Sequence, residues 1–336
     1  MEGKELTNKE SLETSEKKKM SWWKKTLLIT GSTIGGIISL FLAFILVLNV
    51  GKFGIYHNYY TIREVVCTNH GMNDNYVSQG TAVTDDGKYV ITSGYMSDKT
   101  HSRIYITNIE TDETKYVKFT RNGEKNTYHF GGVAVSGDTL YLASASRIFP
   151  ISLEDCFTKD VIDLGDGIKT NNSASFIFAD GSHLYVGEFF DGNSYKTDNH
   201  IEYNNIEYNA ITTVYEIDDL TKPVKVIGIR DKVQGFAVST AGGILLSTSF
   251  GLTSSKFYYY KESNIINTNT TYNDIPLYVL ENHNLLFEGP AMAEDLDYHD
   301  GKFYTNFESS CNKYFFGKLF VSTDKIVALE VEELLA

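Results

Sequence analysis

One strand-rich unit recurs along this chain and limits its fold more than any other feature. The first copy, residues 79–119, reads QGTAVTDDGKYVITSGYMSDKTHSRIYITNIETDETKYVKF. Its four short runs are rich in Val, Ile, Tyr and Thr, which favour strands, and Asp-Gly between the first two is a strong hairpin signal. Four further copies begin near residues 130, 173, 234 and 294. A four-stranded unit repeated at roughly 40–60 residues predicts an all-β fold, a β-propeller.

The number of detectable units predicts five blades. Six remain open if the long fourth or fifth unit contains a further blade. The fifth unit lacks a clear fourth strand, and the isolated segment TIREVVC (residues 61–67) could supply it and close the ring. Two polar insertions, residues 191–209 and 262–274, are expected to be surface loops.

A long apolar run precedes the repeats. Residues 26–48 contain no charged side chain, and at a rise of ~1.5 Å per residue they are long enough to cross a ~30 Å hydrocarbon layer. Five lysines lie closely before the run (residues 17–19, 24 and 25), whereas Lys52 alone follows closely. The positive-inside rule therefore predicts a single-pass protein of the cell membrane, with a cytoplasmic N-terminus and an extracytoplasmic C-terminal domain.

These features divide the chain into four predicted parts. They are a basic, disordered tail (1–25), an uncleaved transmembrane signal anchor (26–48), a stalk (49–60) and an extracytoplasmic propeller (61–336).

The charge of the chain argues against nucleic acid as a partner. Residues 1–25 carry a net charge of +2, which leaves −15 on the remainder of a chain whose total is −13. An acidic body repels phosphate backbones. The sequence also has no GxSxG, HExxH, CxxC or P-loop motif outside the apolar run, so the most familiar hydrolase, zinc and nucleotide sites are missing.

Candidate binding residues come from aligning the units. The innermost strand of each blade lines the central channel, so one end of these strands collects the same position from every blade. That position is occupied by Gln79, Gly131, Ser173, Gln234 and Glu294. The residues that follow are mostly small, which allows neighbouring strands to approach near the axis.

We expect the polar members to form a ligand-binding mouth at this end of the channel. The residues assigned to it are Gln79, His129, Ser173, Gln234, Glu294 and Asp295. Carboxylate and amide oxygens nearby suit a hard cation such as calcium, and the candidate ligands are Glu188, Glu294, Asn306 and Glu308. A polar channel that holds only water is the competing interpretation.

The chain has three cysteines. Cys67 lies on the closing strand, and Cys311 follows the second strand of the last unit, so a disulfide between them could lock the ring. Two free buried thiols are the alternative.

Several phrases resemble a known kind of protein. YVITSGYMSDKTHSRIYITNIETDETK resembles the YVTN-type repeats of bacterial extracytoplasmic propellers, and HFGGVAVSGDTLYLAS looks like a phrase that recurs in poorly characterised members. The resemblance implies the propeller fold and a cell-surface location, and it carries over no settled activity.

The predicted function is accordingly a membrane-anchored, non-enzymatic module that binds a protein or carbohydrate ligand at the bacterial cell surface. The alternative, by analogy with calcium-dependent lactonase propellers, is a metal-dependent hydrolase that uses the channel mouth.

Overall fold

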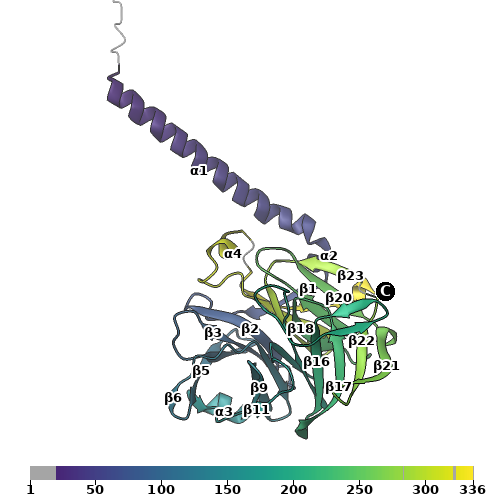
Figure 1. The fold of residues 1–336 in the computed structure, drawn as a ribbon. Coiled ribbons are helices and arrows are strands. Elements are labelled where there is room, and N and C mark those ends of the chain that lie inside the picture. Colours follow the sequence, from purple (N-terminus) through teal and green to yellow (C-terminus); the bar gives the residue numbers. More distant parts are fainter. Residues whose placement is uncertain (1–19, 283, 321–322, 336) are drawn as a thin grey trace, which may run out of the picture. The chain divides into compact units, whose positions relative to one another are not determined.

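The computed structural model describes residues 20–282, 284–320 and 323–335, in two compact units, Met1–Val47 and Leu48–Ala336. Helix α1 (Trp22–Ile55) has 34 residues, none of them buried, and is long and apolar enough to cross a membrane. Figure 1 shows it as one continuous helix. Of the tail predicted to be disordered, residues 1–19 lie outside the described residues, and Trp22–Lys25 belong to α1.

The second unit is a five-bladed β-propeller, which confirms the predicted fold class (Figure 1). Each blade is an antiparallel sheet of at least four strands. Blade 1 contains β2 (Tyr76–Val83), β3 (Tyr89–Met96), β4 (Arg103–Asn108) and β5 (Thr114–Arg121). Blade 2 contains β7 (Gly132–Ser136), β8 (Thr139–Ser144), β9 (Arg147–Ser152) and β11 (Ile168–Lys169). Blade 3 contains β12 (Phe176–Ala179), β13 (His183–Gly187), β16 (Ala210–Glu216) and β17 (Asp219–Ile229). Blade 4 contains β18 (Val233–Val238), β19 (Ile244–Thr248), β20 (Ser255–Tyr260) and β23 (Leu285–Gly289). Blade 5 contains β24 (Ala293–His299), β25 (Lys302–Phe307), β26 (Lys325–Leu329) and β1 (Arg63–Thr68).

Blade 5 is closed by a strand from the other end of the propeller. Strand β1 pairs antiparallel with β26, with Arg63 opposite Leu329 and Thr68 opposite Lys325. The isolated segment at residues 61–67 therefore takes the predicted place. This pairing joins the first and last strands of the ring and leaves no gap between them.

The five inner strands, β2, β7, β12, β18 and β24, contact one another in a closed ring. Glycines make this close approach possible. A Cβ atom added to Gly80 would lie 2.5 Å from the backbone nitrogen of Val133, and one added to Gly132 would lie 2.6 Å from that of Ile177. The small residues at the start of the units thus have the packing role that the repeat suggests.

The outer strands follow the repeat less closely. The segment at residues 160–164, expected as the fourth strand of blade 2, contains β10 (Val161–Asp163), which pairs in parallel with β5 of blade 1. The insertion at residues 262–274 is not a loop: β21 (Ile265–Tyr272) pairs with β22 (Ile275–Leu280), and β22 extends blade 3 beyond β17.

Two other segments are also more ordered than expected. The insertion at residues 191–209 forms the hairpin of β14 (Ile201–Tyr203) and β15 (Ile206–Tyr208), and Tyr208 is fully buried. Residues 49–60, predicted as a stalk, form the end of α1 and the start of α2 (His57–Ile62). Tyr59 of α2 is fully buried in the core shared by blades 3, 4 and 5.

Candidate binding site at the mouth of the propeller

A cavity of about 610 Å³ opens where the inner strands begin. Four of the predicted mouth residues line it: Gln79 from blade 1, His129 before blade 2, Ser173 before blade 3 and Gln234 from blade 4. The repeat brings these side chains together because each stands near the start of an inner strand, and those starts converge on the axis. Glu308, predicted as a cation ligand, lines the same cavity.

A chain of hydrogen bonds connects three of these side chains. Gln79 Nε2 donates to Glu308 Oε2 at 2.7 Å, which turns the amide oxygen of Gln79 toward His129. His129 Nε2 lies 2.7 Å from that oxygen. The oxygen can only accept, so Nε2 carries the proton and the histidine tautomer is fixed by Gln79.

A second group of side chains encloses Glu308. The ring of Tyr95 lies against the ring of His129, with centroids 4.3 Å apart. Lys313 Nζ donates to the hydroxyl of Tyr95 and lies over the rings of Tyr95 and Tyr314 at 4.9 and 5.0 Å. The ammonium group is thus held beside the carboxyl group by aromatic faces.

Aromatic side chains form much of the remaining wall. They are Tyr95, Tyr128, Phe189, Tyr195, Phe250 and Tyr314. Tyr195 and Phe250 lie at the rim with 57% and 44% of their surface exposed, and each is in ring contact with Phe189. Polar groups at the base and exposed rings at the rim suit a ligand that has both hydroxyl groups and an apolar face.

Burial changes the ionisation of the two titratable groups in the hydrogen-bonded chain. Desolvation raises the pKa of Glu308 to about 7, although Tyr314, Lys313 and Gln79 all favour its charged form. Desolvation, together with the charge of Lys313, lowers the pKa of His129 to about 4. Near neutral pH the imidazole is therefore uncharged, and the carboxyl group of Glu308 is close to half-ionised.

Glu294 and Asp295 lie among buried groups and do not line the cavity. Burial and the neighbouring carboxyl groups of Glu308 and Asp295 raise the pKa of Glu294 well above its usual range. Asp295 Oδ2 accepts from the backbone nitrogen of Val133 at 3.4 Å, so Asp295 links the inner strands of blades 5 and 2. Asn306 Nδ2 donates to Ser78 Oγ at 2.7 Å. One oxygen of each of these three side chains is buried without a hydrogen-bond partner: Glu294 Oε1, Asp295 Oδ1 and Asn306 Oδ1.

The four predicted cation ligands do not form one ligand set. Glu188 accepts from Asn199 Nδ2 at 2.6 Å and from the backbone nitrogen of Ile211 at 3.1 Å, so it holds the insertion of blade 3 in place. Glu294 and Glu308 are close enough for each charge to affect the other, and Asn306 lies at the end of β25. Within the described residues, no three or more His, Cys, Asp and Glu side chains are grouped to hold a metal ion. The three predicted carboxylates therefore do not lie together in one group, and the calcium site stays a prediction.

The disulfide between Cys67 and Cys311 is not formed. Both cysteines are free and buried. Cys67 packs with Val83, Val90 and Ile326, whereas Cys311 packs with Met72 and Val77 in a separate cluster. The closing strand is held by the β1–β26 pairing and by packing, without a covalent bond.

Most residues of the cavity wall were not predicted from the sequence. Tyr95 lies at the end of a second strand, and Lys313 and Tyr314 lie in the long connection between β25 and β26. These positions have no counterpart from one unit to the next, so alignment of the units gives no reason to select them. The only available signal was that Lys313 and Tyr314 follow soon after Glu308 in a polar segment.

Comparisons with known proteins find similarity in structure only. No protein-family model matches the sequence, and no functionally curated protein matches it. The resemblance to YVTN-type propellers therefore stays a prediction.

Solved structures match at the level of the fold. A glutaminyl cyclase from Myxococcus xanthus is 10% identical with a TM-score of 0.44, over 80% of this chain and 97% of that one. A PQQ-bound aldose sugar dehydrogenase from Streptomyces coelicolor is 14% identical with a TM-score of 0.40, over 73% and 77%. A hydrazine synthase from Kuenenia stuttgartiensis is 12% identical with a TM-score of 0.37, over 71% of this chain and only 57% of that one. At these values the similarities carry no information on activity.

Proposed function

We propose that this protein is a membrane-anchored propeller that binds a small saccharide in its central mouth, outside the cytoplasm, without altering it chemically. The observation that carries the proposal is the composition of the cavity. Exposed aromatic rings at the rim surround a base made of an amide, a neutral imidazole and a carboxyl group. Such rings stack on the apolar faces of sugar rings, while the base offers donors and acceptors for hydroxyl groups.

The location follows from the sequence around α1. The lysines before the apolar run and the single Lys52 after it favour a cytoplasmic N-terminus. An anchored binding domain outside the cytoplasm would meet cell-surface or environmental glycans. The acidic charge of the propeller is consistent with a partner other than nucleic acid.

The binding test uses the full-length chain in detergent and a set of neutral oligosaccharides. The rim variant is Tyr195→Ala, and its control is Tyr116→Ala, since Tyr116 is 43% exposed on the outer strand of blade 1, away from the mouth. Titration calorimetry should show binding to the wild type, a loss of about tenfold in Tyr195→Ala and no change in Tyr116→Ala, as expected for one stacking ring. Absence of binding by every saccharide, or equal affinity in both variants, would reject the proposal.

Hydrolysis is the second candidate, and one observation favours it. Glu308 lies in an open cavity with a pKa of about 7, which suits a carboxyl group that donates or accepts a proton at neutral pH. The calcium-dependent form of this candidate stays a prediction. A screen of lactones, esters and glycosides, with and without added calcium, tests this candidate; no turnover by the wild type, or equal turnover by Glu308→Gln, would reject it.

A further inference from the structure

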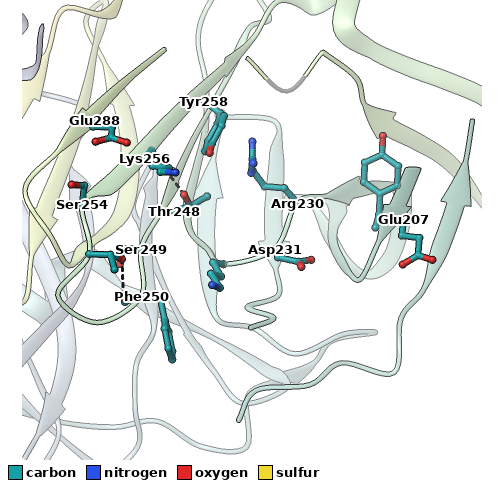
Figure 2. A pocket seen from close by; sticks show the side chains of 13 residues that line it. Glu207, Arg230, Asp231, Thr248, Ser249, Phe250, Ser254, Lys256, Tyr258 and Glu288 are labelled. Carbon is teal, nitrogen blue, oxygen red and sulfur yellow. Dashed lines mark hydrogen bonds between the residues drawn. The ribbon is translucent and has the colours of Figure 1, made fainter. Parts of the chain in front are cut away.

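A second cavity, of about 780 Å³, lies between blades 3 and 4. One side is the connection between β17 and β18, and another is the loop that follows β19 (Figure 2). Ser249 and Phe250 line both this cavity and the mouth. The two cavities are therefore neighbours that share the wall formed by Ser249 and Phe250.

The backbone around the shared wall is fixed by hydrogen bonds. Lys232 donates its backbone N–H to the carbonyl of Phe190 at 2.8 Å and accepts from the backbone N–H of Ser249 at 3.2 Å. The ammonium group of Lys232 lies 5.5 Å from the centre of the Phe250 ring. The two loops thus hold each other in place, and a ligand would not have to order them.

Three basic side chains gather in this cavity, although the chain beyond residue 25 carries a net charge of −15. They are Arg230, Lys232 and Lys256. Among the described residues, no salt bridge joins any of them to an acidic side chain. None of these three charged groups is therefore held in a direct ion pair with another described residue.

Arg230 is the best placed of the three. Its guanidinium carbon lies 3.2 Å from the centre of the Tyr258 ring, so the aromatic face helps to hold the guanidinium group in place. Nη1 of Arg230 is buried and has no hydrogen-bond partner in the protein. A guanidinium held against a ring, with Nη1 unpaired although another donor bonds to Tyr260, suits a planar or tetrahedral oxyanion.

Acidic side chains also line the cavity, and Glu288 lies opposite Lys256 on the paired strands β20 and β23. Figure 2 shows Glu288 and Glu207 at opposite ends, with Lys256, Tyr258 and Arg230 between them. Asp231 accepts from Asn209 Nδ2 at 3.4 Å, and burial raises its pKa while the charges of Lys232 and Arg230 lower it. The acidic side chains therefore offset part of the positive charge of the cavity, but among the described residues none of them forms a salt bridge with Arg230.

We propose that this cavity binds an oxyanion, a carboxylate or a phosphate, carried by the saccharide whose neutral part lies in the mouth. The identity of the saccharide rests on the proposed function above, whereas the oxyanion site rests on Arg230, Lys232 and Lys256 alone. The ligand class is thus an acidic or phosphorylated glycan that passes over Phe250.

The experiment measures binding of three probes to the full-length chain in detergent: inorganic phosphate, glucuronate and glucose. The site variants are Arg230→Gln and Lys256→Gln. Lys256 is exposed, so its substitution leaves the core intact if Arg230→Gln fails to fold. Lys118→Gln is the control, because Lys118 also lies beside a tyrosine ring but on blade 1.

Phosphate or glucuronate should bind the wild type with an affinity that falls as salt is added. That affinity should drop at least about tenfold in each site variant and remain unchanged in Lys118→Gln and Tyr195→Ala. Tighter binding of phosphate than of glucuronate identifies the site as phosphate-selective, and the reverse order identifies it as carboxylate-selective.

The inference is overturned if neither oxyanion binds, or if both site variants that fold bind as the wild type does. Its failure is distinguishable from failure of the proposed function. If oxyanion binding depends on Arg230 or Lys256 but no saccharide binding responds to Tyr195→Ala, the oxyanion site is supported and the saccharide site in the mouth is rejected. If saccharide binding responds to Tyr195→Ala but no oxyanion binding depends on Arg230 or Lys256, only the oxyanion site is rejected.

Discussion

Glu308 stands where the polar base of the mouth meets its aromatic wall. It accepts from Gln79 at 2.7 Å and lies beside the ammonium group of Lys313, yet desolvation still raises its pKa to about 7. The usual pKa of a glutamic acid in an unfolded chain is near 4.5. Ionising this group in the folded protein therefore costs free energy that ionising it in the unfolded chain does not.

The raised pKa of Glu308 lowers the stability of the folded protein as the pH rises. Below pH 4.5 Glu308 is protonated in both states and contributes no penalty. As pH rises from about 4.5 to about 7 the unfolded chain loses its proton first, so the free energy of unfolding falls. Above pH 7 it falls no further on account of this group.

The side chain of Glu308→Gln cannot ionise. The free energy of unfolding of this variant, relative to that of the wild type, should therefore increase by on the order of 1–3 kcal/mol when the pH is raised from 4.5 to 8.

Urea denaturation of the wild type and of Glu308→Gln at pH 4.5 and at pH 8 measures this change in the free energy of unfolding. The lowered pKa of His129 has the opposite effect on stability, but it acts in both chains and largely cancels in the difference. Glu113→Gln, at an exposed position on blade 1, is the control and should show no such change. An equal difference in stability at both pH values would show that Glu308 is not desolvated in solution.

For single residues of the site, the sequence predicts positions that recur in every unit of the repeat and does not predict positions that occur only once. Gln79, Ser173 and Gln234 were found because the start of each inner strand recurs along the chain, and the fold places those starts around one axis. Glu294 has the same register, but its side chain is buried away from the cavity. Register alone does not tell whether a side chain reaches the mouth: Gln79, Gln234 and Glu294 all stand at a register shift in the first strand pair of their blade, and only the first two line the cavity.

The inner strands are the elements that define the ring. Gly132 begins β7, and a Cβ atom there would lie 2.6 Å from the backbone nitrogen of Ile177 in the next blade. A backbone atom in a closed ring cannot move away as the end of a flexible side chain can. In blade 3 the position corresponding to Gly132 is Phe176, which pairs with Gly187 as Gly132 pairs with Ala143, so the repeat alignment that places Ala174 there is two residues out of step.

Gly132→Ala should therefore destabilise the propeller by about 2–3 kcal/mol through overpacking at the axis. Its control is Ala174→Gly, which removes a methyl group from a buried residue just before the inner strand of blade 3 and should cost only about 1 kcal/mol, mainly through added backbone freedom. Midpoints of urea unfolding, followed by far-ultraviolet circular dichroism, compare the two. A loss in Gly132→Ala no larger than that in Ala174→Gly would contradict the close approach of β7 and β12.

The outer strands show where prediction from the sequence fails at the level of elements. The segments that became β10 and β22 have clear strand composition, but composition does not select a partner. Both pair in parallel with the outer strand of the preceding blade, β5 and β17. Such pairings join a strand of one blade to a segment that lies within a later unit of the sequence. The repeat describes only the strands within one blade, so it cannot predict pairing between units.

At the scale of the whole molecule, the fold was predictable because repetition and ring closure reinforce each other. Five copies of one unit specify the blades, and β1 supplies the fourth strand that the fifth copy lacks. The membrane orientation is a separate matter, because it depends on the charges that flank α1. The lysines before the apolar run favour retention of the N-terminus in the cytoplasm.

The three native cysteines provide a low background for testing this orientation. All are buried, and burial raises the pKa of Cys67, Cys156 and Cys311 to about 12, so little thiolate is present at neutral pH. A cysteine introduced at an exposed position should therefore dominate the reaction with a membrane-impermeant maleimide. Asn193→Cys places one on an exposed loop of blade 3, and Ser15→Cys places one in the N-terminal tail.

In intact cells Asn193→Cys should react, whereas Ser15→Cys should react only after the membrane is permeabilised. The chain without an introduced cysteine gives the background. Replacing the lysines at positions 17–19, 24 and 25 with glutamine in the Ser15→Cys chain should remove the charge asymmetry, so that a fraction of these chains becomes reactive in intact cells. Labelling of Ser15→Cys but not Asn193→Cys in intact cells would reverse the orientation, and a mouth facing the cytoplasm could not meet extracellular glycans.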